Sequence, residues 1–238
     1  MRVLLVHCKH RPFEVDRFSR AWVAAGGNPA ELFPVTPAAA REVLVESPVP
    51  VDGLLLTGGP DVEPWRYGQR PQPGVELDTD PGRDALDLLL LSRADGEGWP
   101  VLAVCYGCQL LAVHRGGTLV QDLPHQGQGH NLRDGRRDRF AHPVLRRGSP
   151  RFLSWLPEEL PVNSRHHQAV DLPGRDLVVV GRAPDGVVEA VEAGEGDRFE
   201  VGVQWHPEDL ISEPHLELFR SFRRACQARS LVSPGGEE

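Results

Sequence analysis

The sequence predicts an α/β protein: an open, mostly parallel sheet with helices on both faces, and an antiparallel β region appended in the C-terminal half. In the first half, short apolar runs typical of strands alternate with helical segments, which favours a parallel sheet covered on both faces. In the second half, three strand-like runs follow closely with Gly, Pro and Asp between them, which indicates hairpins or a meander. The 238 residues contain no internal repeat, low-complexity linker or composition break. One domain over residues 1–232 is therefore predicted, followed by a flexible tail at 233–238.

Glycine and proline set the limits of the elements in the first half. Strands are predicted at residues 2–6, 30–35, 51–57 and 100–104. Helices are predicted at residues 13–25, 82–95 and 106–115. The pairs Gly26-Gly27 and Gly116-Gly117 end two of these helices, and Gly58-Gly59-Pro60 forms a turn after the third strand. The segment 82–95 has acidic residues near its start and a leucine-rich face, as an amphipathic helix requires.

The second half ends in a helix. Strands are predicted at residues 177–181, 187–193 and 199–205. The helix at residues 213–229 carries its apolar side chains along one face: Leu216, Phe219, Phe222 and Cys226.

The composition argues against nucleic-acid and membrane partners. The formal charge is −8, and the arginines of segment 133–140 alternate with aspartates, so this segment is predicted to be a solvated loop or hairpin. No apolar run approaches the ~20 residues of a membrane span, and the N-terminal apolar run is too short for a signal peptide. We therefore expect a soluble, cytoplasmic protein with reduced thiols. A homodimer is expected only from the general frequency of dimers among soluble enzymes.

Cys105 and Cys108 stand three positions apart between an apolar run and a predicted helix, and four interpretations compete. A structural zinc site would need a second Cys or His pair at short spacing, which is absent, so no metal is predicted. A thioredoxin-like dithiol fits the strand-to-helix position, but such chains are usually shorter and carry the motif near the first strand. Two buried structural cysteines are the third interpretation, because free cysteine packs as a small hydrophobic residue.

The fourth interpretation, a nucleophile elbow, explains the flanking residues and is preferred. A strand that turns sharply into a helix needs small residues two positions before and two after the nucleophile. Around Cys105 these are Ala103 and Gly107, whereas Cys108 is flanked by the larger Tyr106 and Leu110. Cys105 is therefore the predicted nucleophile, and the N-terminus of the following helix would favour its thiolate. Cys108 is predicted to lie on the helix and pack inward.

A cysteine nucleophile needs a base and a group that orients the base, and the stretch "VGVQWHPEDL" supplies both. The apolar run reads as a strand ending near Trp205. His206 and Glu208 are two positions apart, so in an extended backbone they project to the same side. Pro207 favours an extended conformation at His206. Surface polarity would explain such a pair in isolation, but together with an elbow cysteine the pair indicates a catalytic base and its partner.

Five stretches carry a specific resemblance in order, spacing and context. They are "LLLTGGPDVEPWRYG" (54–68), "DPGRDALDLLLL" (80–91), "PVLAVCYGCQLLAVHRGGTLVQDL" (100–123), "VNSRHHQAV" (162–170) and "VGVQWHPE" (201–208). Together they resemble the class I glutamine amidotransferase superfamily and, within it, the γ-glutamyl-γ-aminobutyrate hydrolase (peptidase C26) family. The first 50 residues are similar only in beginning with a strand.

The resemblance implies a flavodoxin-like sheet and a Cys-His-Glu triad. Cys105 resembles the nucleophile, His206 the general base and acid, and Glu208 the acid that orients the histidine. The backbone N–H groups of Gly59 and Tyr106 resemble the two halves of the oxyanion hole.

The resemblance also implies residues that hold the substrate. Gln109 matches a glutamine that helps to hold the α-amino acid end of the substrate. The segment 163–168 matches a stretch that lines the same pocket, which makes Ser164, Arg165, His166 and His167 candidate substrate-binding residues. For His166 and His167, loop packing and turn hydrogen bonding remain equally good explanations.

These residues predict a cysteine-dependent hydrolase that cleaves γ-glutamyl amides, such as γ-glutamyl-γ-aminobutyrate, through a γ-glutamyl thioester. The resemblance implies neither a metal nor an organic cofactor. One alternative is a glutaminase subunit that supplies ammonia to a separate synthetase, which would then be a partner. Another is a non-catalytic binding protein that retains the fold. The intact set of triad residues argues against the second alternative.

Overall fold

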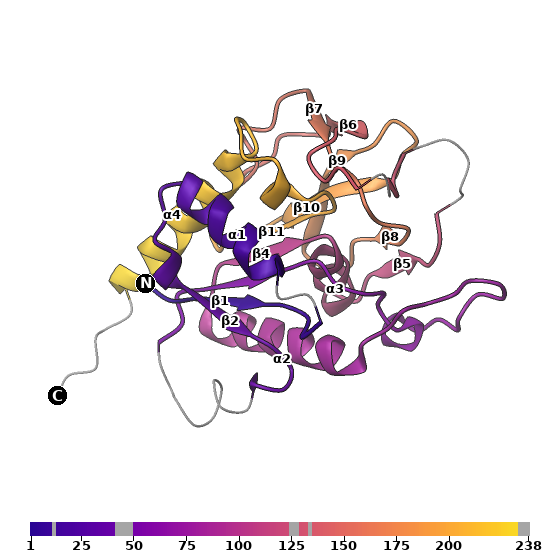
Figure 1. The fold of residues 1–238 in the computed structure, drawn as a ribbon, viewed down its shortest axis with the longest axis horizontal. Coiled ribbons are helices and arrows are strands. Elements are labelled where there is room, and N and C mark those ends of the chain that lie inside the picture. Colours follow the sequence, from indigo (N-terminus) through magenta and orange to yellow (C-terminus); the bar gives the residue numbers. More distant parts are fainter. Residues whose placement is uncertain (11–12, 41–49, 124–128, 133–134, 233–238) are drawn as a thin grey trace.

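The computed structural model describes residues 1–10, 13–40, 50–123, 129–132 and 135–232. Within these ranges the chain forms a nine-stranded sheet and a separate two-stranded sheet (Figure 1). The nine-stranded sheet has the order β2-β1-β3-β4-β11-β10-β9-β6-β7. Its first five strands, from β2 to β11, are parallel to one another, and from β11 onward each neighbouring pair is antiparallel.

The large sheet is built from strands of four to six residues. Its strands are β1 (Val3–Val6), β2 (Leu32–Val35), β3 (Gly53–Leu56), β4 (Val101–Val104), β6 (His142–Arg146), β7 (Glu159–Val162), β9 (Leu177–Arg182), β10 (Val188–Ala193) and β11 (Glu200–Val203). The small antiparallel sheet pairs β5 (Thr118–Val120) with β8 (Ala169–Leu172). Strands β1, β3, β4 and β11 are buried along their whole length, as strands covered on both faces must be.

The helices are α1 (Phe13–Ala24), α2 (Pro81–Glu97), α3 (Tyr106–His114) and α4 (Leu216–Val232). Local sequence explains the limits of α2: the Asp80 side chain caps its first turn through the Arg83 N–H at 3.0 Å, and Gly98 ends it in a left-handed conformation.

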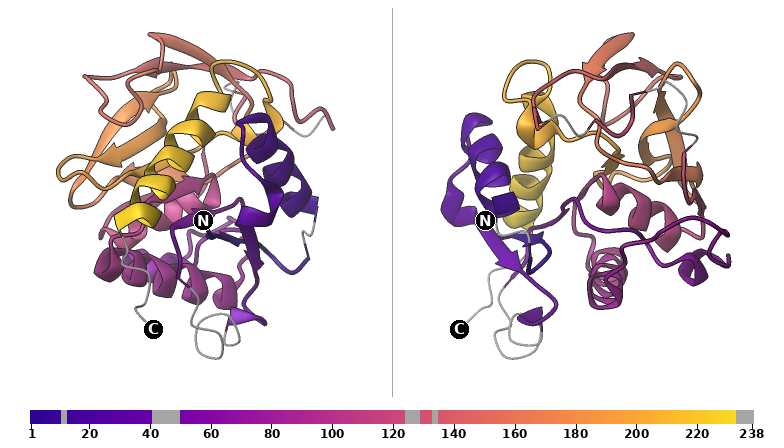
Figure 2. Two further views of the ribbon diagram at one scale, coloured as in Figure 1. Left: turned by 90° about the vertical axis from the view of Figure 1, so that its left-hand side faces the viewer. Right: turned by 45° about the vertical axis from the view of Figure 1, so that its right-hand side comes forward.

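Two apolar cores lie on opposite faces of the parallel strands. One joins α1 and α4 to the sheet through Phe18, Trp22, Phe219 and Phe222. The other joins α2 and α3 to the opposite face through side chains such as Leu90 and Leu111. The two helix pairs stand on either side of the sheet in the right-hand view of Figure 2. The predicted α/β fold, with a mostly parallel core and added antiparallel strands, is therefore confirmed.

All predicted helices and strands are present, with limits that differ by at most three residues. The predicted grouping of the last three strands was incomplete. β10 pairs with β9 and β11 as antiparallel neighbours, but β11 also lies parallel to β4 in the middle of the sheet. Strands β5, β6, β7 and β8 were not predicted from the sequence. The predicted tail at 233–238 lies outside the described residues.

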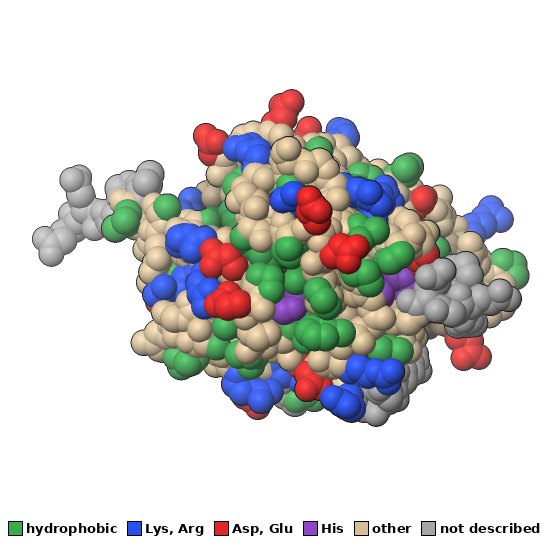
Figure 3. All heavy atoms as spheres, turned by 90° about the horizontal axis from the view of Figure 1, so that it is seen from above, with side chains coloured by type: hydrophobic (Ala, Val, Ile, Leu, Met, Phe, Trp, Pro, Cys, Tyr) green, Lys and Arg blue, Asp and Glu red, His purple; other side chains and the backbone are tan. Residues whose placement is uncertain are grey.

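Two observations bear on membrane and nucleic-acid partners. No helix in the described ranges is long and apolar enough to span a bilayer. Acidic and basic side chains are interspersed on the face seen in Figure 3, and the described residues form no continuous basic patch on that face.

Candidate active site

Cys105 occupies a strained bend between β4 and α3. Its backbone has φ 54° and ψ −108°, a positive φ that side-chain-bearing residues rarely adopt. The bend brings the start of α3 against β3: a Cβ atom on Gly107 would lie 2.7 Å from the Leu56 carbonyl oxygen. Only glycine fits there. The structure thus has the sharp strand-to-helix turn expected of an elbow, with Cys105 at its tip.

Cys108 lies inside the protein. It is fully buried on α3 and packs against β11, where a Cβ on Gly202 would meet its sulfur at 2.8 Å. Burial raises the pKa of the Cys108 thiol far above its usual value. This environment fits the predicted inward-packed cysteine and not a second nucleophile.

The pairing of β4 with β11 brings the candidate base to the bend. Val203 lies opposite Val104 in this parallel pair, and the Cys105 N–H donates to the Val203 carbonyl oxygen at 2.8 Å. The carboxyl ends of neighbouring parallel strands meet at one edge of a sheet, where α/β proteins usually bind ligands. His206, three residues after β11, therefore lies at the same edge as Cys105.

His206 and Glu208 are hydrogen-bonded, with 2.6 Å between Nδ1 and Oε1. The backbone differs from the prediction: Glu208 lies in a 3₁₀ turn at Pro207–Asp209, not in an extended segment. The turn curls the carboxylate back toward the ring of His206, which has φ −109° and ψ 82°. The two side chains meet as predicted, but by a different local geometry.

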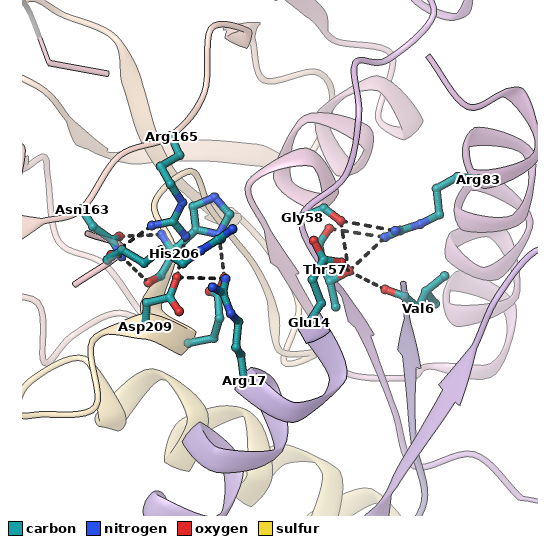
Figure 4. Close-up of polar contacts among 12 residues, drawn as sticks. Val6, Glu14, Arg17, Thr57, Gly58, Arg83, Asn163, Arg165, His206 and Asp209 are labelled. Atoms are coloured by element: carbon teal, nitrogen blue, oxygen red, sulfur yellow. Dashed lines mark hydrogen bonds and ion pairs between the residues drawn. The ribbon is translucent and has the colours of Figure 1, made fainter. Parts of the chain in front are cut away.

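Asn163 holds the backbone of His206 from both sides. Its Oδ1 accepts from the His206 N–H at 2.9 Å, and its Nδ2 donates to the His206 carbonyl oxygen at 2.9 Å. The edge of the His206 ring faces the turn after β3, since a Cβ on Gly58 would lie 3.2 Å from Cε1. Figure 4 shows Asn163 beside His206. Together with the Glu208 hydrogen bond, these contacts fix the imidazole between the turn and Glu208.

Burial determines the ionisation of this pair. It lowers the pKa of His206 well below its usual range, and the positive charge of Arg165 acts in the same direction. The imidazole is therefore neutral at pH 7. Burial raises the pKa of Glu208 to about 7, against the opposing effect of Arg165. With Nδ1–H directed at Glu208, Nε2 is left as a proton acceptor.

The turn that follows β3 is braced by a buried arginine. Arg83 is fully buried on α2, pairs with Asp87 at 2.8 Å, and donates to the carbonyl oxygens of Thr57 and Gly58 at 3.3 Å each. The Thr57 hydroxyl donates to the Val6 carbonyl oxygen at 2.7 Å, and also contacts a Glu14 carboxylate oxygen (Figure 4). With its carbonyls held in this way, the turn has a fixed orientation.

Gly59 and Tyr106, the candidate oxyanion-hole residues, are in contact. A Cβ on Gly59 would lie 2.7 Å from the Tyr106 ring, so the turn can approach the elbow only as glycine. The Tyr106 side chain is buried, and its hydroxyl donates to Asp84 at 2.5 Å. The tyrosine side chain thus anchors the first residue of α3, while its backbone N–H stays beside Cys105.

Two cavities meet at Cys105. The first, of about 320 Å³, is lined by Cys105, His206 and Glu208 together with four arginines: Arg17, Arg136, Arg137 and Arg165. The second, of about 170 Å³, is lined by Tyr106, Gln109 and acidic and imidazole side chains: Asp61, Asp78, His166 and His167. Gly59, Cys105, Asn131 and Arg165 line both cavities.

The predicted substrate-binding residues separate into two groups. Arg165 lines both cavities, and Gln109 and His167 line the second. His167 is bracketed by Asp61 and Asp122, at 2.8 and 3.1 Å, and the Asp61 hydrogen bond is the largest cause of its raised pKa.

The remaining two predicted residues point mainly into the protein. Ser164 is buried, donates to the His130 carbonyl oxygen at 2.7 Å and lines neither cavity. His166 lines the second cavity, but one of its ring nitrogens contacts the Gln168 carbonyl oxygen at 2.9 Å and the other faces Glu189 at 3.5 Å.

Three arginines of the first cavity, Arg17, Arg136 and Arg137, were not predicted from the sequence, whereas Arg165 was. Arg17 comes from α1, and Arg137 from the segment that was predicted to be solvated. Asp209, which follows Glu208 in the chain, pairs with Arg165 at 2.5 Å and with Arg17 at 3.4 Å (Figure 4). Burial lowers the pKa of Arg137, and the charges of Arg17 and Arg165 lower it further, so an anion in this cavity would relieve mutual repulsion.

His206, Glu208 and Asp209 lie close enough to hold a metal ion. Nδ1 of His206, however, is already hydrogen-bonded to Oε1 of Glu208, and Oδ2 of Asp209 is paired with Arg165 and Arg17. This trio is therefore better described as a base, its orienting acid and a neighbouring ion pair than as a metal centre.

Comparison with known proteins finds relatives that match most of this chain. The peptidase C26 family model matches residues 9–208. A Mycobacterium tuberculosis protein, provisionally named a glutamine amidotransferase, is 38% identical over 214 residues, which are 84% of this chain and 68% of that protein. The γ-glutamyl-γ-aminobutyrate hydrolase of Escherichia coli K12 is 37% identical over 227 residues, covering 89% of this chain and 85% of the hydrolase.

A solved structure shares the fold. A glutamine amidotransferase from Thermotoga maritima superimposes with a TM-score of 0.62. The match covers 98% of this chain and 99% of that one at 16% sequence identity, so it speaks to the fold alone.

Proposed function

The chain belongs to the peptidase C26 family of glutamine amidotransferase-like hydrolases, and we propose that it hydrolyses γ-glutamyl amides with Cys105 as nucleophile. One observation carries the proposal: Cys105, at the tip of a strained bend, opens into the same cavity as a neutral His206 that is hydrogen-bonded to Glu208 at 2.6 Å. A catalytic nucleophile, its general base and the acid that orients the base are arranged in this way.

The reaction would proceed in two stages. Nε2 of His206 takes the thiol proton as the Cys105 sulfur attacks the γ-carbonyl carbon. The N–H groups of Gly59 and Tyr106 donate to the resulting oxyanion; losing one such donor typically costs ~10²–10³ in rate. The tetrahedral intermediate collapses to a γ-glutamyl thioester as His206 protonates the departing amine. His206 then takes a proton from water, which attacks the thioester, and glutamate and the free thiol are released.

The linings of the two cavities support an assignment of the two ends of the substrate. His206 must protonate the leaving amine, and it lines only the first cavity, so the amine belongs there. The glutamyl part then occupies the second cavity, where Asp61 and Asp78 suit an α-ammonium group and Gln109 lies on the wall. Arg165 lines both cavities and can face the α-carboxylate.

The arginines of the first cavity favour a leaving amine that carries a carboxylate. Arg17, Arg137 and Arg165 lie together there, with Asp209 as the partner of two of them. The γ-aminobutyrate released by the Escherichia coli relative is an amine of this kind. A γ-glutamyl amide of a short amino acid is therefore the substrate class that we propose.

A matched panel of amides tests this assignment. γ-Glutamyl-γ-aminobutyrate, neutral γ-glutamyl-butylamide and cationic γ-glutamyl-putrescine differ only at the distal end of the amine. We expect kcat/KM to be about 10–100-fold higher for the carboxylate substrate, as one charged hydrogen bond provides. Arg137→Gln should remove most of this preference without changing kcat/KM for the neutral substrate. Equal rates across the panel would refute the amine assignment.

Cys105→Ser is the control for catalysis itself, and mass spectrometry after treatment with a γ-glutamyl electrophile locates the nucleophile. We expect the label on Cys105 and none on the buried Cys108. Absence of hydrolysis together with absence of this label would overturn the hydrolase proposal and favour a binding protein.

The glutaminase alternative rests on the Mycobacterium tuberculosis relative, which is provisionally named for glutamine amidotransfer. A glutaminase subunit would release ammonia from glutamine, and only with its synthetase partner present. Assaying glutamine with the isolated chain and again with a lysate fraction added separates this function from stand-alone hydrolysis.

A further inference from the structure

Behind the second cavity, four potential metal ligands converge inside the protein. They come from four separate segments: His130, His142 at the start of β6, His166, and Glu189 on β10. Their ligating atoms all lie within 4.8 Å of one another. All four side chains are more than nine-tenths buried, with exposed fractions of 6%, 6%, 2% and 0%.

The atoms that face the centre of this cluster have no hydrogen-bond partners in the described part of the chain. They are Nδ1 of His130, Nε2 of His142, Nε2 of His166 and both carboxylate oxygens of Glu189. Buried polar atoms are normally satisfied, and five unpartnered acceptor atoms around one point would be satisfied together by a bound cation.

The outer nitrogen of each imidazole contacts an acceptor, which fixes the tautomer. Nε2 of His130 lies 3.0 Å from a carboxylate oxygen of Asp185. Nδ1 of His142 lies 3.2 Å from the Pro143 carbonyl oxygen. Nδ1 of His166 contacts the Gln168 carbonyl oxygen. Each outer nitrogen must therefore carry the proton in the neutral ring, which turns the inner lone pairs toward Glu189. Metal-binding histidines are oriented by outer acceptors in the same way.

The separations match a tetrahedral ion better than hydrogen bonds. The inner nitrogens of His130, His142 and His166 lie 3.4, 3.6 and 3.5 Å from Oε1 of Glu189. An N–H···O hydrogen bond spans about 2.7–3.2 Å. Ligand atoms about 2.0–2.1 Å from a tetrahedral zinc ion are roughly 3.3–3.4 Å apart, which is close to the observed spacing.

We propose that His130, His142, His166 and Glu189 bind one Zn²⁺ ion in a closed, four-coordinate structural site. Three imidazoles and a carboxylate are ligands that suit zinc, and four protein ligands leave no open position for a substrate or water. The ion is separate from the chemistry at Cys105, so this inference does not depend on the proposed function.

A proton is the rival cation. A single imidazolium could donate to Glu189, but it would leave the other two inner lone pairs facing the carboxylate and each other. One short contact and two longer ones would then be expected, whereas the three separations are alike. Metal content distinguishes the two cations directly.

The first experiment uses the wild-type chain. Protein from zinc-supplemented culture is purified without chelator and analysed for metal by mass spectrometry, and then stripped with dipicolinate and reloaded. We expect one equivalent of Zn²⁺ and a fall of about 5–10 °C in the unfolding midpoint on stripping, reversed by reloading. Reloading with Co²⁺ should give the intense visible absorption of a tetrahedral ion. Less than a tenth of an equivalent and no thermal shift would overturn the proposal in favour of the proton.

Variants then locate the ion. Glu189→Gln and His142→Gln should lose the bound equivalent and the zinc-dependent thermal shift. His114→Gln, which alters a histidine that pairs with Asp95, should retain both. His206→Gln should also retain them. Loss of zinc in His206→Gln with retention in Glu189→Gln would place the ion in the candidate active site and refute the proposed ligands.

Discussion

Replacing Gly107 with alanine tests whether the bend at Cys105 depends on the close approach of α3 to β3. The added Cβ would lie 2.7 Å from both Cβ and the carbonyl oxygen of Leu56. Carbon atoms pack best at about 3.5–4.0 Å, so α3 would have to move by roughly 1 Å. Overpacking of this kind costs ~1–3 kcal/mol, partly offset by ~0.5–1 kcal/mol for removing a helical glycine. A net loss of about 1–2 kcal/mol is expected.

The same displacement would carry Cys105 with it. A misplacement of about 1 Å can reduce an enzymatic rate by about 10²-fold, so kcat/KM for a γ-glutamyl amide should fall roughly 10–100-fold. Urea unfolding measures the stability, and iodoacetamide alkylation followed by peptide mass spectrometry measures the reactivity of Cys105. Gly96→Ala is the matched control, because its Cβ would meet nothing within 4 Å. If Gly107→Ala equals this control in both measurements, the bend does not depend on the contact.

Three further predictions concern ionisable side chains. Glu208→Gln should lower kcat about 10²–10⁴-fold. In the wild type, activity should rise with pH near 7, because Glu208 ionises there and can then accept a hydrogen bond from His206. This rise should be absent from the pH–rate profile of the variant. Arg83→Met should destabilise the fold by about 3–5 kcal/mol in urea because Asp87 is left buried and unpaired; adding Asp87→Leu should recover much of this loss. Burial lowers the pKa of His215 to about 4 in the folded protein. As pH falls below about 6.5, His215 is therefore protonated in the unfolded chain before it is protonated in the folded one, which favours unfolding. Relative to a His215→Gln variant, the wild type should lose about 2 kcal/mol of unfolding free energy between pH 7.5 and 5.

Periodicity and turn residues were sufficient to predict the parallel core. Strands β1, β3 and β4 are continuous apolar runs, and burial on both faces leaves little ambiguity. Strands β6 and β7 could not be recognised in this way. Pro143 of β6 lies opposite Pro161 of β7, and proline in a short, partly exposed run argues against a strand unless the pairing partner is known. β7 is an edge strand, and β6 pairs with its other neighbour, β9, only at Leu145 and Arg146. These pairings, which are tertiary facts, make the two prolines acceptable.

The candidate site likewise contains residues that a local sequence pattern reveals and residues that only the fold reveals. His206 and Glu208 are neighbours in the sequence, and the elbow has a local pattern of small residues, so both could be found without a structure. Arg17, Arg136 and Arg137 of the first cavity have no such pattern. Arg137 belongs to a stretch of alternating charges that resembles a solvated loop, and only the fold places it beside Asp209 and Arg165.

The proposed zinc ligands are separated by 12, 24 and 23 positions, so no rule based on short spacing could detect them. Segment 163–168 shows how the fold connects them to the active site. Alternate side chains of an extended segment face opposite sides. Asn163 and Arg165 face His206 and Asp209, whereas Ser164 and His166 face the zinc ligands.

An ion bound to His166 would therefore hold Arg165 in position from the other side of the same backbone. Stripping zinc from the wild type should raise KM for a carboxylate-bearing γ-glutamyl amide several-fold, because Arg165 lines both cavities. It should change kcat much less, because His206 is held independently by Asn163 and Glu208. Steady-state kinetics before and after reloading measure this difference. A several-fold fall in kcat with KM unchanged would show that the ion supports the base and not the substrate-binding arginine.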